Sequence, residues 1–371
     1  MHQERITTLQ NHLAADQGSL ITDFYNIFYL TGFRGISPQE REAVAFFTKR
    51  KAYLFLPAMY GEQGKNLKTV KNGFVELDID HERDGLLFCY QKKLNKGIRT
   101  VFFEDHNVKV RELEMLKKKA VIKVNWKPSP TPLAHKRAKK DAAEQLLLQK
   151  AAAITDAIWN KTVNFLQNTD YTKLKEFDVA HFMLQEARRL GAESEGFATI
   201  VASGPNSSRP HHVTSNRRLR HQEPLLIDCG FYYQGYTADL TRTIFLGSPD
   251  QEFRKIYTLV KNANHQSIKQ CHAGSAVSEL CGIANEIFFR AALLPHYLHG
   301  LGHGVGLEVH EPPFLRNQGT EQLEPGMIIT IEPGLYFSGK FGIRIEDLIL
   351  ITDKEPRILS HNSTKELLFI E

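Results

Sequence analysis

Three prolines interrupt the sequence within WKPSPTPL, Trp126–Leu133, at positions 128, 130 and 132. Proline has a fixed φ and no backbone N–H, so such a stretch can continue neither a helix nor a central strand. The chain has 371 residues, which is long enough for two domains. We therefore expect one domain over residues 1–130 and a second over residues 131–371.

The first part has the pattern of a small mixed α/β domain. Ile6, Leu9 and Leu13 follow helical spacing and predict an opening helix. Short apolar runs typical of strands follow at residues 19–22, 43–47, 52–56, 100–103 and 121–124. Two of these runs flank Thr48–Lys51, which predicts a hairpin at that point.

The second part alternates amphipathic helices with acidic strands. Apolar residues at helical spacing predict helices through residues 154–165, 178–190, 253–260 and 277–291, with Asp178 as the N-cap of the second. Strand-like segments rich in Gly, Asp, His and Glu lie between them. Helices and acidic strands alternate in two rounds, which predicts an α/β (α+β) core made of two related halves.

Composition narrows the class of protein. The net charge of +5 is mild, and the basic cluster His135–Lys140 is interpreted as a solvated helix start. Neither an N-terminal apolar h-region nor an apolar run of membrane-spanning length is present, and the four cysteines lack zinc-type spacing. We expect a cytoplasmic protein with reduced cysteines that binds neither nucleic acid nor a membrane.

The stretch HGLGHGVGLEVHE, residues 299–311, contains three histidines and four glycines. Each glycine costs a helix about 1 kcal/mol relative to alanine, so an extended segment is expected. His299 and His303 then lie about 13 Å apart, at roughly 3.3 Å per residue, and cannot share one ion. A metal site here takes one histidine from this stretch and its other ligands from elsewhere.

Two acidic strand pairs can supply those ligands. Leu225–Gly247 predicts a hairpin in which Asp228 faces Asp239, and Thr330–Leu350 predicts one in which Glu332 faces Glu346 across a loop at Ser338–Lys340. Carboxylates that close, within apolar strands, need a cation or a proton. Four carboxylates and one imidazole can hold two divalent ions. Such ions share a bridging hydroxide, which acts as the nucleophile, and they polarise a carbonyl. The pattern therefore indicates metal-dependent hydrolysis.

At these residues the sequence resembles the metallopeptidase family of Xaa-Pro aminopeptidases and prolidases. HGLGHGVGLEVHE is similar to the signature around its metal-binding histidine, DCGFYYQGYTADLTRT to its two-aspartate motif, and TIEPGLY with GIRIED to its glutamate motifs. NIFYLTGF, residues 26–33, resembles the creatinase-type N-terminal domain. The resemblance implies that domain followed by a pita-bread catalytic domain of two pseudo-symmetric halves.

The resemblance also implies roles for individual residues. The implied metal ligands are Asp228, Asp239, His303, Glu332 and Glu346, and Glu332 is also the implied proton shuttle. His310 and one of His211 and His212 are implied to act on the substrate or the tetrahedral intermediate, and His211 is preferred. His299, Arg344 and Tyr336 are the implied substrate-binding residues. Arg344 orients Glu332 or a substrate carboxylate, or forms a structural ion pair.

Together these features predict a dinuclear metallo-aminopeptidase that removes the residue before proline from short peptides. Mn²⁺ is the expected ion, with Co²⁺, Zn²⁺ and Fe²⁺ as alternatives, and a homodimer is expected from the resemblance. A strict Xaa-Pro dipeptidase and a catalytically silent creatinase-like interaction protein stay open as alternatives. A dipeptidase also needs a basic group for the substrate carboxylate; the candidates are Arg209, Arg217, Arg218 and Arg344.

Overall fold

The computed structural model describes residues 2–80, 86–94, 97–120, 122–130 and 133–371. Its internal contacts divide the chain into two compact units, Met1–Arg137 and Ala138–Glu371. The boundary expected between residues 130 and 131 touches positions outside the described ranges and stays a prediction. None of the helices in the described ranges combines the length and the apolar character needed to cross a membrane.

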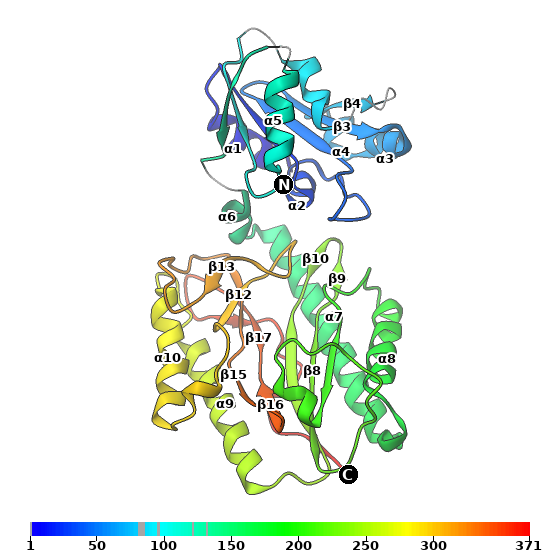
Figure 1. The fold of residues 1–371 in the computed structure, drawn as a ribbon, viewed down its shortest axis with the longest axis vertical. Helices are drawn as coiled ribbons and strands as arrows, with labels where there is room; N and C mark the ends of the chain where they lie inside the picture. The colour runs from blue at the N-terminus through cyan, green and yellow to red at the C-terminus, as the bar shows by residue number, and fades with distance from the viewer. Residues whose placement is uncertain (1, 81–85, 95–96, 121, 131–132) are drawn as a thin grey trace. The chain divides into compact units, whose positions relative to one another are not determined.

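The first unit is a mixed sheet with strand order β4-β3-β2-β1-β5-β6 and helices around it (Figure 1). The strands are β1 (Gln17–Ile21), β2 (Val44–Thr48), β3 (Ala52–Pro57), β4 (Glu76–Asp80), β5 (Thr100–Phe103) and β6 (Asn125–Pro128). The helices are α1 (His2–Asn11), α2 (Phe24–Thr31), α3 (Gly61–Asn66), α4 (Lys68–Lys71) and α5 (Val110–Lys119), while α6 (Leu133–Ala138) spans the unit boundary.

Most of the strands expected in this unit are confirmed. The predicted hairpin joins β2 to β3, which pair antiparallel, and the backbone N–H of Thr48 donates to the carbonyl of Lys51 at 2.8 Å. Of the strand expected at residues 121–124, position 121 lies outside the described ranges. Over residues 122–124 the expectation is wrong, because β6 begins at Asn125 and pairs with β5. Pro128 can end β6 because this strand lies at the edge of the sheet.

The second unit holds two sheets, with strand orders β19-β11-β8-β7 and β13-β12-β14-β17-β18. The strands of the first are β7 (Ile200–Ser203), β8 (Glu223–Cys229), β11 (Leu240–Leu246) and β19 (Phe369–Ile370). Those of the second are β12 (Gly302–Gly304), β13 (Glu311–Leu315), β14 (Ile328–Ile331), β17 (Asp347–Leu350) and β18 (Arg357–Ile358). Two short hairpins extend them: β9 (Tyr232–Tyr233) with β10 (Tyr236–Thr237), and β15 (Gly334–Phe337) with β16 (Phe341–Arg344).

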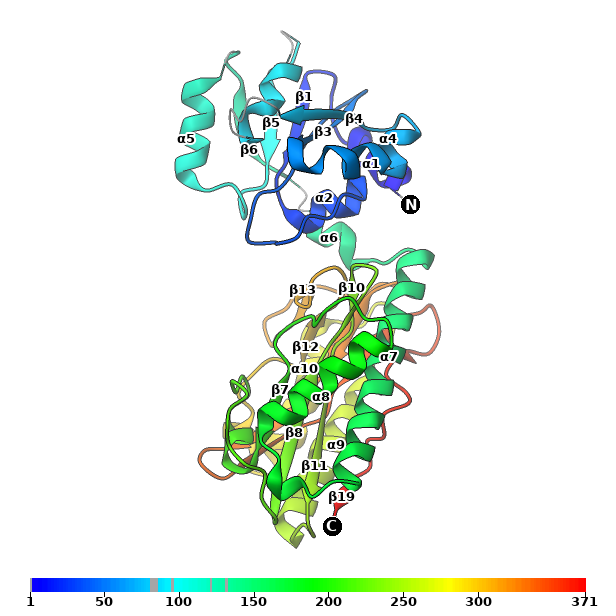
Figure 2. The same cartoon turned by 90° about the vertical axis from the view of Figure 1, so that its right-hand side faces the viewer.

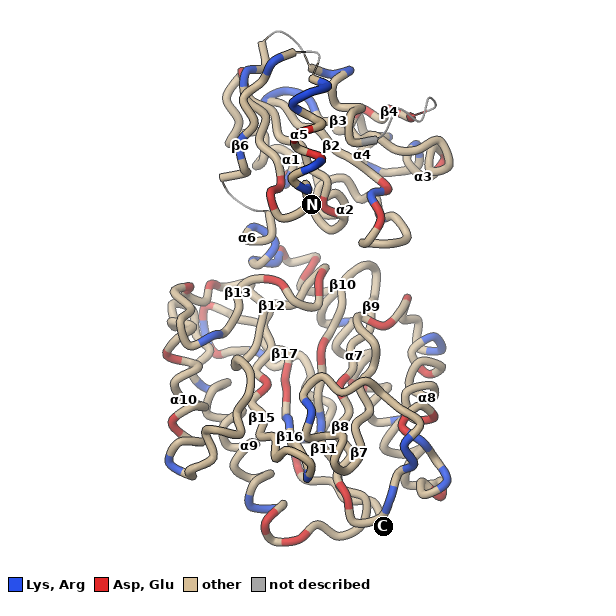
Figure 3. The backbone as a smooth tube through the Cα atoms, in the orientation of Figure 1, with Lys and Arg blue, Asp and Glu red and all other residues tan. Residues whose placement is uncertain are grey.

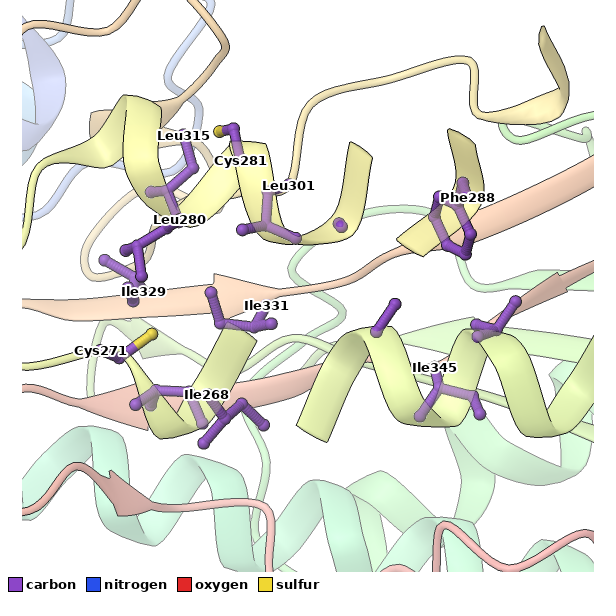
Figure 4. Close-up of a cluster of buried hydrophobic side chains, with 14 of the residues drawn as sticks. Ile268, Cys271, Leu280, Cys281, Phe288, Leu301, Leu315, Ile329, Ile331 and Ile345 are labelled. Carbon is purple, nitrogen blue, oxygen red and sulfur yellow. The ribbon is translucent and has the colours of Figure 1, made fainter. Parts of the chain in front are cut away.

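Each half of this unit buries its sheet under its own pair of helices. Helices α7 (Ala142–Gln167) and α8 (Glu176–Arg189) lie in front of β8 and β11 in Figure 2. Helices α9 (Gln251–Lys269) and α10 (Val277–Arg290) cover the other half, where Leu280 of α10 lies beside Ile329 of β14 (Figure 4). Phe288 and Ile331 belong to the same buried cluster. Burying each such side chain stabilises the fold by about 1.5–3 kcal/mol. The expected α/β core of two related halves is confirmed.

The helix faces read from the sequence are the buried ones, but one helix start differs. Val179, Met183 and Ala187 of α8 are buried, as their spacing predicts. Asp178 is not the N-cap: α8 begins at Glu176, and Asp178 accepts a hydrogen bond from the backbone N–H of Lys175 at 2.7 Å. An acidic residue in the first turn can satisfy an N-terminal N–H from within the helix.

Candidate metal centre and pocket

The first acidic strand pair brings Asp228 and Asp239 to the same site in a register that differs from the expected one. Asp228 pairs with Thr241 across β8 and β11, so Asp239 lies before β11 and diagonal to Asp228. A hairpin with Asp228 directly opposite Asp239 would centre its turn on Tyr233–Gln234. The turn centres on Gln234 and Gly235 instead, whose φ angles are 48° and 84°. Glycine adopts such angles at little cost, so the two-residue turn places it there.

The second acidic pair has the expected register. Ile331 pairs with Asp347 and Gly334 with Arg344, which is the register in which Glu332 opposes Glu346. The loop Ser338–Lys340 has Gly339 at its centre with φ of 71°, as predicted. In Figure 3, red segments mark acidic residues on the central strands of this unit.

The glycine-rich stretch is extended at His303, as expected. Gly302–Gly304 forms β12, and His303 pairs with Phe314 of β13. A Cβ at Gly302 would lie 2.1 Å from the carbonyl oxygen of Thr330, so only glycine allows the strands to approach this closely. The chain then bends, which brings the ring centroids of His303 and His310 to 4.3 Å.

These elements bring a candidate metal centre together. Among the described residues, Asp239, His303 and Glu346 each offer a ligand atom within 4.8 Å of the others, and all three are buried. Glu332 Oε1 lies 3.3 Å from His303 Nε2. Asp228 shares the pocket wall with them, although its Oδ2 binds Arg344 Nη2 at 2.5 Å.

The electrostatics of the cluster fit divalent cations. Burial, and then repulsion from neighbouring carboxylates, raises the pKa of Asp239 and Glu346 well above its ordinary value. Within the described structure, Asp228 Oδ1 and Glu346 Oε1 are buried without a hydrogen-bond partner. Buried oxygens of this kind cost free energy unless a donor or a cation reaches them. The donor set of carboxylates and one imidazole suits Mn²⁺, Co²⁺, Fe²⁺ or Zn²⁺.

Glu332 differs from the two raised carboxylates. Burial raises its pKa, but the hydrogen bond and positive charge of His303 outweigh this and lower the pKa to about 2. The pKa of His303 is correspondingly raised, because Glu332 outweighs the effect of burial on the ring. Thr330 Oγ1 also donates to Glu332 Oε1 at 3.2 Å. Glu332 is therefore an ionised carboxylate in contact with an imidazole.

Arg344 organises the floor of the site, but its hydrogen bonds go to Asp228 rather than to Glu332. Besides Asp228, its Nε donates to Thr241 Oγ1 at 2.9 Å, and its Nη1 donates to the Tyr336 hydroxyl at 2.7 Å. Arg344 thus forms an ion pair with Asp228, while its expected role in binding a substrate carboxylate stays a prediction. Thr241 in turn donates to Glu346 Oε2 at 2.7 Å.

A pocket of about 840 Å³ lies over the cluster. His211, His299 and His310 line it, together with apolar residues such as Phe177 and Leu184. His299 Nε2 lies 2.9 Å from the Tyr336 hydroxyl. His299 lies outside the cluster of ligand atoms that could hold a metal among the described residues. All of the residues implied for substrate binding or catalysis thus stand around this one pocket or in contact with it.

His211 and His212 have different surroundings. His211 is exposed in the pocket wall, whereas His212 is buried and its Nε2 lies 2.9 Å from Glu176 Oε2. Sequence reasoning missed Glu176 and Thr241. Thr241 could have been found from its position two residues after Asp239, because a spacing of two keeps a strand residue on the same face. No comparable sequence signal marks Glu176.

Comparison with known proteins agrees with this architecture. The model of metallopeptidase family M24 matches residues 147–353, and that of the creatinase/prolidase N-terminal domain matches residues 5–139. An Xaa-Pro dipeptidase from Pyrococcus horikoshii is 33% identical over 90% of this chain and 89% of its own.

Solved structures agree as well. An Xaa-Pro dipeptidase from Bacillus anthracis has a TM-score of 0.88 at 29% identity, covering 100% of this chain and 99% of its own. An X-Pro aminopeptidase from Thermotoga maritima has a TM-score of 0.84 at 25% identity, with 100% of both chains covered. The chain therefore belongs to metallopeptidase family M24, with a creatinase-type N-terminal domain before its pita-bread catalytic domain.

Proposed function

We propose that the protein hydrolyses the bond before proline at the N-terminus of short peptides, with two divalent metal ions. The observation that carries this proposal is the buried cluster Asp239, His303 and Glu346 at a peptide-sized pocket, in which the pKa of both carboxyl groups is raised. Relatives that cover nearly the whole chain are named Xaa-Pro dipeptidases, which supports the substrate class.

The proposed metal ligands are the two residues of each acidic strand pair and one histidine. Asp239 and Glu346 would bridge the ions, His303 would bind one of them, and Asp228 and Glu332 would complete the set. Bound ions of this kind polarise the peptide carbonyl and lower the pKa of bound water. Mn²⁺ is the ion we expect.

The other residues would handle protons and orient the substrate. Glu332 is ionised and buried, so it can accept a proton from the attacking water. Burial lowers the pKa of His310 to about 4, with His303 adding to the effect, so its ring is neutral at pH 7 and can hydrogen-bond the substrate. His299, held by Tyr336, would orient the peptide, and His211 would donate a proton or orient the leaving group. A site built on side chains suits Xaa-Pro bonds, because proline offers no N–H to bind.

One observation favours a dipeptidase as a second candidate. Among the described residues that line the pocket, the permanent cations are Arg316 and Arg344, whereas Arg209, Arg217 and Arg218 lie elsewhere. Arg344 is bound to Asp228, but Arg316 is exposed, lies 5.2 Å from the Phe314 ring centroid, and has no carboxylate partner within the described structure. A free guanidinium at the pocket wall can bind a substrate carboxylate.

Matched substrates test the proposal and separate the two candidates. With Mn²⁺ supplied, the protein should hydrolyse alanylproline or alanylprolylalanine faster than alanylalanine. An aminopeptidase should accept both proline peptides, whereas a dipeptidase should prefer alanylproline over both the tripeptide and alanylprolinamide. Loss of that preference in Arg316→Ala would assign the carboxylate to Arg316. A protein that binds Mn²⁺ but cleaves none of these peptides would instead fit a silent creatinase-like protein.

The proposal includes the setting of the enzyme. We expect a homodimer in the cytoplasm that acts on free short peptides without nucleic acid or membrane partners. The absence of a membrane-spanning helix from the described ranges is consistent with such a setting. Sedimentation at a mass twice the 42.3 kDa of one chain is the expected result for the dimer.

A further inference from the structure

The neighbouring histidines His211 and His212 differ in exposure. His211 is exposed and lies in a turn in which His212 N donates to the carbonyl of Arg209 at 3.1 Å, whereas His212 is buried. Across residues 211–214, exposed and buried side chains alternate, with His212 and Thr214 on the buried side. His211 stands within this turn, beside the buried His212, so fixing His212 also restricts the position of His211. Burial is the main cause that lowers the pKa of His299 and His310, and the nearby His211 adds to it. His211 lines the same pocket as both.

The segment that carries His211 lacks the support of a sheet. Within the described range 133–371, residues 209–217 belong to no helix or strand. No hydrogen bond, ion pair or ring contact holds the His211 side chain to another described residue. Its position therefore depends on the backbone around it, and that backbone needs other anchors.

Thr214 Oγ1 accepts from Val201 N and donates to the Thr199 carbonyl, and Arg344 donates to the Pro210 carbonyl. One buried carboxylate supplies further anchors. Glu176 Oε1 accepts from Ser203 N and Oγ at 2.8 and 2.7 Å and from Asn206 Nδ2 at 2.8 Å. Its Oε2 accepts from His212 Nε2 at 2.9 Å and from Ser215 N and Oγ at 3.0 and 2.6 Å. These donors come from both sides of His211 in the sequence. Glu176, at the start of α8, thus ties both ends of the segment to a helix.

The charge in this arrangement lies on Glu176. His212 Nδ1 is buried and has no partner in the described structure. A neutral ring with its proton on Nε2 avoids a buried, charged N–H without an acceptor. Burial raises the pKa of Glu176, but hydrogen bonds from Ser215, Asn206, Ser203 and His212 outweigh this and hold the pKa below its ordinary value. The carboxylate therefore stays ionised and keeps accepting all of these hydrogen bonds.

We propose that Glu176 and His212 form a brace that positions His211 for turnover. The inference rests on the proposed function, in which His211 acts on the substrate. None of the hydrogen bonds described for Glu176 and His212 goes to the metal cluster, so the brace should affect kcat through His211 while leaving metal binding intact. Glu176 and His212 are positioning residues in this account.

A double-mutant cycle with His211 tests the brace. Glu176→Gln should lower kcat for alanylproline by up to about 100-fold, the cost of misplacing a group by about 1 Å, with little change in KM or bound metal. In the His211→Ala background the same substitution should have almost no further effect on kcat. A merely structural role would lower kcat by the same factor in both backgrounds, and that result would overturn the proposal.

A matched control and a second pair of variants complete the test. Glu186 is also a buried carboxylate on α8, but it pairs with Lys161 at 2.9 Å and with Arg189, so Glu186→Gln should leave kcat unchanged. If Glu176→Gln does not fold, His212→Leu should lower kcat, and His212→Gln, which keeps an N–H donor, should restore most of it. Wild-type kcat in His212→Leu would refute the brace. Absence of Xaa-Pro hydrolysis in the wild type would instead refute the proposed function.

Discussion

Binding of divalent ions should release protons from the metal-free protein. Burial, and then neighbouring carboxylates, raises the pKa of Asp239 and Glu346 well above its ordinary value, so this pair retains protons that an exposed pair would lose. The pKa of His303 is raised as well, because Glu332 outweighs burial. A metal ligand must be deprotonated, so each ion that binds displaces protons from these groups.

The size of the effect follows from the groups involved. We expect about one to three protons per chain near pH 7, since Asp239, Glu346 and His303 are the groups that retain them. For each proton that is released on binding, the metal affinity rises about tenfold per unit increase in pH, which is about 1.4 kcal/mol of binding free energy. At pH values below their ordinary pKa, the carboxyl groups with raised pKa contribute their full stability to the metal-free fold. That contribution is lost as the pH rises through the raised pKa values. The gain in Tm on adding metal should therefore grow with pH.

Calorimetry measures the protons directly. Mn²⁺ is titrated into chelator-treated protein at one pH in two buffers with different ionisation enthalpies, and the difference in heat gives the number of protons released. His299→Ala is the matched control. Burial is the main cause that lowers the pKa of His299, so its neutral ring has no proton to release, and removing it should leave the number of released protons unchanged. Equal heats in both buffers, with pH-independent affinity, would show that the carboxylates are already ionised and would refute this reasoning.

Four substitutions test the assigned roles. Asp239→Ala should abolish activity and metal binding together, because a bridging carboxylate holds both ions; wild-type turnover with quantified metal would contradict the assignment. His310→Ala should keep its metal and lose about 10²–10⁴-fold in kcat, the contribution of a positioned acid or base, so loss of both ions would show that His310 is a ligand. His303→Ala should lose metal affinity, whereas His299→Ala should change only KM or kcat; a structure with both rings on one ion would contradict this difference.

Buried faces and strands could be predicted from the sequence where apolar residues repeat at the spacing of a helix or strand that packs on the core. The period of 3.6 places Val179 and Met183 on the buried face of α8, and the apolar residues before Glu332 identify a buried strand. In the second hairpin the glycine at position 339 fixes the loop, and with it the register that pairs Glu332 with Glu346. Local signals of this kind require no knowledge of the rest of the fold.

Features that depend on tertiary contacts could not be predicted from the sequence. The first hairpin offers several polar turn positions, and the turn at Gln234–Gly235 depends on which residues adopt a positive φ. The observed register therefore differs from the register predicted from the sequence. Arg344 reaches Asp228 from a different strand pair, and no spacing within either strand reveals that contact. The six hydrogen bonds to Glu176 join segments up to 39 residues apart, which sequence pattern alone does not connect.

The central claim is that metal ions held by the Asp239–His303–Glu346 cluster carry out hydrolysis before proline. The most direct measurement titrates metal-free protein with Mn²⁺ and follows bound metal and alanylproline hydrolysis in the same samples. The account predicts that activity rises only with bound metal and levels off at about two ions per chain, as in dinuclear hydrolytic sites. Turnover without bound metal, or a fully loaded protein that leaves alanylproline intact, would contradict it.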